Sequence, residues 1–197
     1  QGDDQEIRKT YNLSDSDFVI VSVCRLVKRK GVEFLIQAIS KIKDQNIHLF
    51  VIGNGKEKDG LVKLVSDLGL EKTVHILGKV KDIVPFYKIA NVSTLVSYTL
   101  PDDGDFEGLG LVLLEAQSYG VPVIGSRSGG IPEAFEDKVT GIVVEPRNVD
   151  EIANAILKMK NDREYTKLLA KNTKVFLESR FGVKNTVIRY IELCSSL

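Results

Sequence analysis

The run FVIVSVC at residues 18–24 restricts the possible folds more than any other stretch of this chain. It is almost continuously apolar and rich in β-branched residues, with no alternation of apolar and polar side chains. This pattern is typical of a strand that is buried on both faces, and such strands belong to parallel sheets. We therefore expect an α/β architecture with helices on both sides of a sheet.

The rest of the chain repeats this alternation of strands and helices. Further strands are predicted at residues 47–52, 73–77, 92–97, 121–125 and 141–144, and helical patterns separate them. The order predicts a Rossmann-like, doubly wound parallel sheet of about six strands with right-handed crossovers. A length of 197 residues suits one domain with one sizeable core. Two more helices are expected after residue 160, with a break at residues 181–182.

Composition excludes several classes of protein. The 27 basic and 27 acidic residues cancel, so charge offers no argument for a nucleic-acid partner. No apolar run reaches membrane-spanning length, and the start QGDDQEIRK carries no signal-peptide core, which indicates a cytoplasmic protein. Cys24 and Cys194 are expected to be small buried hydrophobic residues rather than a disulfide.

Residues 106–122, FEGLGLVLLEAQSYGVP, predict a glycine turn followed by a helix. Gly108 and Gly110 permit turn geometry and a close approach of the backbone to a ligand. Residues 111–114 are apolar on every side, which predicts a buried helix, and the order glycine then proline at its end is typical of a stop. The helix N-terminus carries a partial positive charge and suits a phosphate group.

Two carboxylates bracket this helix start. Glu115 could accept hydrogen bonds from two ribose hydroxyls, and Glu107 could face a sugar beyond the phosphates. The alternative is that Glu107 only complements the helix dipole and that Glu115 pairs with a distant base.

A basic loop, RLVKRKG, follows the first strand at residues 25–31. Ligands in open α/β sheets bind at the carboxyl ends of the strands, so this loop is a candidate anion site. A plain cluster of surface charges is the alternative. The turn GNG at residues 53–55 lacks the third glycine of a dinucleotide fingerprint, which disfavours NAD.

Taken together, these motifs resemble the nucleotide-sugar half of the family-four GT-B glycosyltransferases, a retaining group. The resemblance rests on two glutamates separated by seven residues, on the following GVPVIGSRSGGIPE, and on the R-x4-K-G pattern of the basic loop. It covers residues 18–197, which it implies are a donor-binding domain. Residues 1–17 resemble a remnant of the interdomain linker, and an N-terminal acceptor domain is expected to precede them.

The resemblance also implies roles for single residues. Arg25 and Lys30 would hold the diphosphate of the donor and act in catalysis with Glu107. Lys28 and Arg29 match nothing in the family pattern and are expected to be solvated. The implied donor-binding residues are Gly53, Val80, Gly108, Leu109, Gly110, Leu111, Val112 and Glu115.

Leu109 departs from the usual EGFG turn, which puts the identity of the sugar in doubt. The reaction implied is transfer of a sugar from a UDP- or GDP-sugar to an unknown acceptor with retention, without a metal or another cofactor. Association with the inner face of a membrane could arise through the preceding domain. The rival functions are another GT-B enzyme, such as a nucleotide-sugar epimerase, and a non-catalytic module that binds nucleotide sugars.

Metal binding is not expected from the remaining polar residues. Asp102, Asp103 and Asp105 form an acidic stretch without EF-hand spacing, so a solvated loop is predicted. His48 and His75 are too few for a histidine metal cluster, and His75 is expected to be a core or edge residue of a strand.

Overall fold

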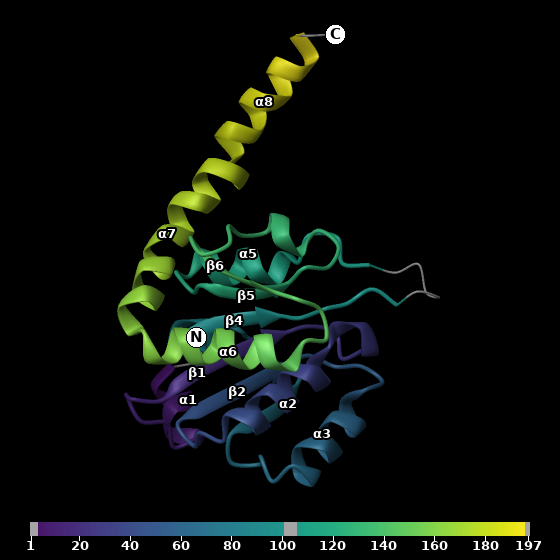
Figure 1. Ribbon diagram of the computed structural model, residues 1–197. Coiled ribbons are helices and arrows are strands. Elements are labelled where there is room, and N and C mark those ends of the chain that lie inside the picture. Colours follow the sequence, from purple (N-terminus) through teal and green to yellow (C-terminus); the bar gives the residue numbers. More distant parts are fainter. Residues whose placement is uncertain (1–3, 101–105, 196–197) are drawn as a thin grey trace.

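The computed structural model describes residues 4–100 and 106–195, and Figure 1 shows their arrangement. Six parallel strands form one sheet in the order β3-β2-β1-β4-β5-β6. The strands are β1 (Phe18–Val23), β2 (Ile47–Ile52), β3 (Val74–Gly78), β4 (Val92–Leu95), β5 (Val123–Ser126) and β6 (Gly141–Val144). This is the predicted Rossmann-like α/β fold, with strand ends displaced by up to two residues from their predicted positions.

Helices lie on both faces of the sheet, as the alternation of elements predicted (Figure 1). They are α1 (Asp4–Thr10), α2 (Val32–Ile42), α3 (Lys58–Asp67), α4 (Val84–Ile89), α5 (Leu111–Ser118), α6 (Val149–Asn161), α7 (Arg163–Phe181) and α8 (Val183–Ser195). Short 3-10 turns occupy Lys28–Lys30 and Ile131–Glu133.

Strand β1 lies inside the sheet and feeds both hydrophobic layers. Phe18 and Ile20 belong to the layer formed with α2, α3 and α6, whereas Val19 and Val21 belong to the layer formed with α4 and α5. All four side chains are 0% exposed. Burial of a large apolar side chain contributes about 1.5–3 kcal/mol. The continuous apolar run therefore follows from burial on both faces.

The sheet reverses its winding direction between β1 and β4. Strand β1 pairs with β2 on one side and with β4 on the other, and all these pairings are parallel. Ligands in open α/β sheets bind outside the carboxyl ends of the strands at such a switch point. Here those ends carry the basic loop after β1 and residues 96–100 after β4.

The segment predicted as a linker contains a helix that the sequence analysis did not foresee. Helix α1 packs against α4. The Tyr11 ring that follows it meets Phe50 edge-on, with centroids 4.8 Å apart. The first residues of the described chain are therefore anchored on the sheet.

The last two helices break between Phe181 and Gly182, as predicted, and α8 extends away from the sheet (Figure 1). Cys194 on α8 is exposed, so the expectation of a buried residue is wrong there, while Cys24 is partly buried. Both cysteines are free, which confirms that no disulfide joins them. No helix among the described residues is long and apolar enough to cross a membrane.

Candidate functional site

An open depression of about 430 Å³ lies at the switch point, where β1 ends and α5 begins. It combines the basic loop with the glycine turn, which are about 80 residues apart in the sequence. Its lining residues are Val23, Cys24, Arg25, Arg29, Lys30, Glu107, Gly108, Leu109, Gly110, Leu111 and Val112. The structure thus brings together eight of the residues predicted from the sequence, since Arg25, Lys30, Glu107 and residues 108–112 are all among them.

Glu107 is the charged centre of this depression. Lys30 Nζ makes a close ion pair with Glu107 Oε2, and Arg29 lies 3.3 Å from the same oxygen. The Ser97 hydroxyl donates a hydrogen bond to Oε2 over 3.1 Å. The side chains of Arg29, Lys30 and Glu107 are only 12%, 10% and 13% exposed. Their charges are therefore less screened by water than those of surface pairs.

The partners of Glu107 determine its protonation state. Burial alone would raise its pKa, but the hydrogen bond and charge of Lys30, the Ser97 hydroxyl and the charge of Arg29 lower that pKa below its ordinary value. Glu107 is consequently a carboxylate at neutral pH. It can stabilise positive charge but cannot donate a proton.

Arg29 and Ser97 are the contributors that the sequence analysis missed. The expectation that Arg29 is solvated is wrong, because the 3-10 turn Lys28–Lys30 directs it toward Glu107. Lys28 is exposed, as expected. Ser97 is only 1% exposed and follows the apolar end of β4. Its position just after a strand, at the edge of the sheet where ligands bind in such folds, was the signal that could have identified it.

Helix α5 presents its N-terminus to the depression. Gly110 caps it in the left-handed conformation, with φ of 74°, and no side chain caps this end. A Cβ on Gly110 would lie 2.9 Å from the Leu95 side chain, so both the conformation and the packing favour glycine. The expectation of a fully buried helix is wrong, because Leu111 is 65% exposed. The uncapped N–H groups and the helix dipole make this end suitable for an anion.

The paired glycines after β5 hold the turn that carries Glu107. The Gly130 N–H donates to the Glu107 carbonyl over 2.9 Å. A Cβ on Gly129 would lie 2.2 Å from the Glu107 carbonyl oxygen, and one on Gly130 would lie 1.6 Å from that of Gly108. These two glycines therefore leave room for the backbone of the turn itself.

Three predicted residues lie outside the lining of the depression. A Cβ on Gly53 would lie 1.8 Å from the Cys24 carbonyl oxygen, so the strand ends themselves require this glycine. Val80 is partly buried against the layer that contains α4 and α5. Glu115 is exposed on α5, near Tyr87; burial raises the pKa of the Tyr87 hydroxyl, and the Glu115 charge raises it further.

The thiol of Cys24 also borders the depression. Burial, above all, raises its pKa to about 11, although the Lys30 charge acts in the opposite direction. The reactive form of a cysteine is the thiolate, which this site disfavours at neutral pH. Cys24 therefore contributes shape rather than nucleophilic chemistry.

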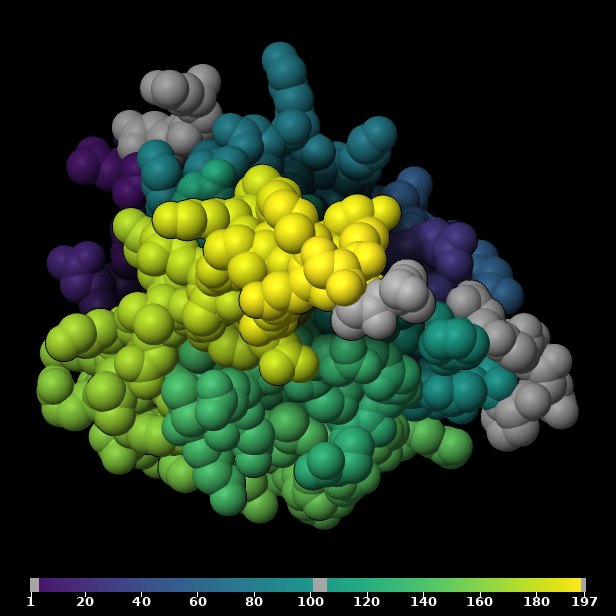
Figure 2. Space-filling model, turned by 90° about the horizontal axis from the view of Figure 1, so that it is seen from above, coloured from purple at the N-terminus to yellow at the C-terminus, as the bar shows by residue number. Residues whose placement is uncertain are grey.

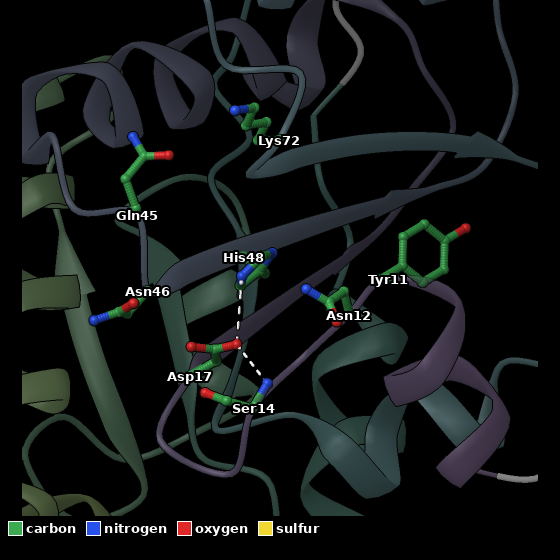
Figure 3. Close-up of a pocket in the computed structure, with 8 residues that line it drawn as sticks. All are labelled: Tyr11, Asn12, Ser14, Asp17, Gln45, Asn46, His48 and Lys72. Atoms are coloured by element: carbon green, nitrogen blue, oxygen red, sulfur yellow. Dashed lines mark hydrogen bonds and ion pairs between the residues drawn. The ribbon is translucent and has the colours of Figure 1, made fainter.

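A second polar pocket, of about 480 Å³, lies at the opposite end of the strands (Figure 3). Asp17 there accepts a hydrogen bond from the Ser14 N–H over 2.7 Å, and His48 lies 3.6 Å from the same carboxylate oxygen. The His75 ring stacks on Phe50 and is half-buried, which confirms it as a strand residue of the core edge. The contacts of Asp17 anchor the segment that enters β1.

Metal ligands do not gather within residues 4–100 and 106–195, where no group of three suitable side chains occurs. The acidic residues Asp102, Asp103 and Asp105 lie outside the described residues.

The sheet order and the depression at the switch point place this chain in the class of Rossmann-like α/β domains that bind ligands at the carboxyl ends of their strands. Within that class, the family described as "Glycosyl transferases group 1" matches residues 3–176. The chain therefore belongs to this family of glycosyltransferases.

Two relatives illustrate the match. The chain is 36% identical over 163 residues to the GDP-mannose-dependent alpha-(1-6)-phosphatidylinositol monomannoside mannosyltransferase of Mycobacterium tuberculosis (strain ATCC 25618 / H37Rv), covering 81% of this chain and 42% of that protein. It is 29% identical over 186 residues to the N-acetyl-alpha-D-glucosaminyl L-malate synthase of Bacillus anthracis, covering 94% and 47%. The chain thus spans less than half the length of these relatives.

A solved structure shows the same arrangement. The crystal structure of Anabaena Alr3699/HepE in complex with UDP-glucose superposes with a TM-score of 0.83 at 27% identity, covering 98% of this chain and 52% of that one. The C-terminal domain of the group 1 protein LpcC from Francisella tularensis shares the fold, with a TM-score of 0.75 at 23% identity, 93% of this chain and 95% of that one being covered. The predicted fold, one half of a GT-B glycosyltransferase, is confirmed.

Proposed function

We propose that this domain holds the nucleoside diphosphate sugar of a retaining glycosyltransferase whose acceptor binds mainly to a preceding domain. The observation that carries the proposal is the cluster of Arg29, Lys30 and Glu107 facing the uncapped start of α5. Cations and helix N–H groups suit a diphosphate, and a carboxylate beside them suits the sugar. HepE, which is similar over 98% of this chain, was solved with UDP-glucose.

The charge of the leaving group determines the mechanism that we propose. Breaking the bond between the sugar and the diphosphate leaves negative charge on the phosphate oxygens. Arg25, Lys30 and the N–H groups of Leu111 and Val112 would stabilise it, and one preorganised donor of this kind is typically worth about 3 kcal/mol in rate. Arg29, which the structure adds, would contribute to the same field. No metal is needed for this charge balance.

Glu107 would face the donor sugar on the other side of the phosphates. Its lowered pKa keeps it ionised, so that it can steady positive charge that develops on the sugar ring. Glu115 would accept hydrogen bonds from the ribose, and the backbone near Gly53 and Val80 would approach the diphosphate and the nucleobase. We expect the donor to carry UDP or GDP as its nucleotide.

The exposed apolar side of α8 supports a partner domain. Val183, Val187, Tyr190, Ile191 and Leu193 are between 50% and 79% exposed. Figure 2, viewed from above, shows α8 in yellow in front of the rest of the molecule. We expect this face to pack against the preceding domain, which would slow amide hydrogen exchange in α8 of the full-length protein relative to this chain. Equal exchange in both would exclude the contact.

Calorimetric titration with UDP, GDP, ADP and their sugar conjugates, with and without magnesium, tests the donor site. We expect one nucleoside diphosphate to bind regardless of magnesium. Glu115→Ala should weaken that binding at least about tenfold, because a charged hydrogen bond is worth about 1.5–3 kcal/mol. Glu164→Ala is the matched control, since Glu164 is an exposed residue of α7 that pairs with Lys167 and does not line the depression.

The same titration separates the proposal from its rivals. If no nucleotide binds to this chain or to the full-length protein, the donor site is wrong. If the full-length protein binds a nucleotide sugar but neither hydrolyses nor transfers it, a binding module is the better description. Inversion at the anomeric carbon of the product would contradict retention.

A further inference from the structure

The two oxygens of the Glu107 carboxylate have different surroundings. Arg29, Lys30 and the Ser97 hydroxyl all contact Oε2. No residue among those that the structure describes donates a hydrogen bond to Oε1. Oε1 is also not one of the described side-chain atoms that are buried without a partner, so it is not buried. Oε1 is therefore accessible, whereas Oε2 is held by the protein.

The three partners of Oε2 differ in what they can do when a donor binds. Arg29 and Lys30 are cations that border the depression, so the phosphates of a ligand compete with Glu107 for them. Ser97 is neutral, does not line the depression and is 1% exposed. It is the contact to Oε2 that a diphosphate cannot take over.

Ser97 is itself fixed from two sides. Its carbonyl accepts a close hydrogen bond from the Ser126 hydroxyl at the end of β5, and Ser126 is 0% exposed. The N–H of the next residue, Tyr98, donates to the Arg29 carbonyl over 2.8 Å. The position of the Ser97 hydroxyl is thus determined by β5 and by the basic loop together.

We propose that Ser97 is a positioning residue that holds Glu107 by Oε2 and so keeps Oε1 directed at the donor sugar while Arg29 and Lys30 engage the diphosphate. This inference rests on the proposed function of the depression. It assigns separate tasks to the two carboxylate oxygens, one structural and one facing the ligand. A rotamer of Glu107 that is held only by the cations would lose its orientation when the phosphates attract them.

The test compares Ser97→Ala with Ser93→Ala, a matched control. Ser93 lies in β4, is also 1% exposed and has no side-chain contact with Glu107. The full-length protein is assayed for release of UDP from UDP-glucose and of GDP from GDP-mannose, by slow hydrolysis of the donor. We expect Ser97→Ala to lower kcat about tenfold and to leave KM and the Kd of the nucleoside diphosphate within about twofold of wild type. Ser93→Ala should change none of these three quantities.

A second measurement does not depend on turnover. Carboxyl carbon NMR of this chain reports the pKa of Glu107 directly. Because the hydrogen bond from Ser97 favours the ionised form, Ser97→Ala should raise that pKa, Ser93→Ala should not, and Ser97→Thr, which keeps the hydroxyl, should restore the wild-type value.

The outcomes separate this inference from the proposed function. Wild-type turnover together with an unchanged kcat and pKa in Ser97→Ala would overturn the role of Ser97 alone. A loss of kcat matched by an equal loss of nucleotide affinity would also overturn it, because that result indicates general damage to the site. Absence of nucleotide binding and of turnover in the wild-type full-length protein would overturn both.

Discussion

Replacement of Glu107 by glutamine tests the central charge of the site, because it keeps the size of the side chain and removes its negative charge. In the structure, Lys30 and Arg29 both form ion pairs with this carboxylate. The side chains of Lys30, Arg29 and Glu107 are each less than 14% exposed. The exchange leaves two cations without their carboxylate. We therefore expect opposite effects on the binding of a nucleoside diphosphate and on turnover.

The effect on binding follows from Coulomb's law. For unit charges about 8 Å apart at an effective dielectric constant of about 20, removal of one repulsion favours binding by about 2 kcal/mol. Solvent screening in the open depression reduces this to about 1 kcal/mol, or about fivefold in Kd. Glu107→Gln should therefore bind UDP or GDP as tightly as wild type or up to about fivefold more tightly.

The effect on turnover has the opposite sign. If Glu107 stabilises charge that develops on the sugar, its loss should lower kcat about 10²- to 10³-fold, the range measured for preorganised electrostatic groups. Calorimetry on this chain and donor hydrolysis by the full-length protein measure the two quantities separately. Glu145→Gln is the control, because Glu145 pairs with Arg127 in an exposed position.

Two results would refute this reasoning. An equal loss of affinity and turnover would show that Glu107 only binds the donor. Unchanged turnover would show that it serves the fold alone. The pH dependence adds a check: because the folded-state pKa of Glu107 is lowered, its contribution to stability is present above its unfolded-state pKa and is lost as pH falls through the folded-state pKa. The stability difference between wild type and Glu107→Gln should therefore shrink in acid.

Two further predictions concern stability. Gly130→Ala should lower the free energy of unfolding by at least about 2 kcal/mol, because its Cβ would lie 1.6 Å from the Gly108 carbonyl oxygen. Gly60→Ala is the control: a Cβ there meets nothing within 4 Å in α3, so this change should raise the free energy of unfolding by about 0.5–1 kcal/mol. Urea unfolding measures both variants, and equal effects would contradict the backbone contact. Burial, with a smaller contribution from the charge of His48, lowers the pKa of His75 to about 4. As the pH falls, His75 is therefore protonated in the unfolded chain before it is protonated in the folded protein. After allowance for partial exposure, the free energy of unfolding should fall by about 1–2 kcal/mol between pH 6.5 and pH 4. His75→Gln should flatten this slope, and an unchanged slope would show that His75 is not its source.

Much of the architecture follows from local patterns. The continuous apolar run at residues 18–24 predicted a strand that is buried on both faces. In the structure, the two faces of β1 do pack in two separate hydrophobic layers. The turn at Gly110 and the helix that begins at Leu111 were predicted because glycine adopts the left-handed conformation of that cap without steric cost. These features depend on neighbours in the sequence, so the sequence reveals them.

Other features depend on distant contacts and were missed. Arg29 was expected to be solvated, yet the turn after β1 directs it toward a glutamate 78 residues away. Helix α1, within the segment expected to be linker, was not foreseen, and it packs on α4. Leu111 was expected to be buried, but it lies at the rim of the depression. No local pattern reports on such partners.

Local sequence patterns are enough to predict that this chain forms a parallel α/β domain, that a helix begins at a glycine turn, and that basic and acidic residues follow its strands. Periodicity, glycine conformation and helix capping are local, and they do not need the fold to be known. Tertiary structure alone decided which of those charges meet. Winding in opposite directions from β1 brings the loop after β1 beside the turn before α5, and only there do Lys30, Arg29 and Ser97 converge on one oxygen of Glu107.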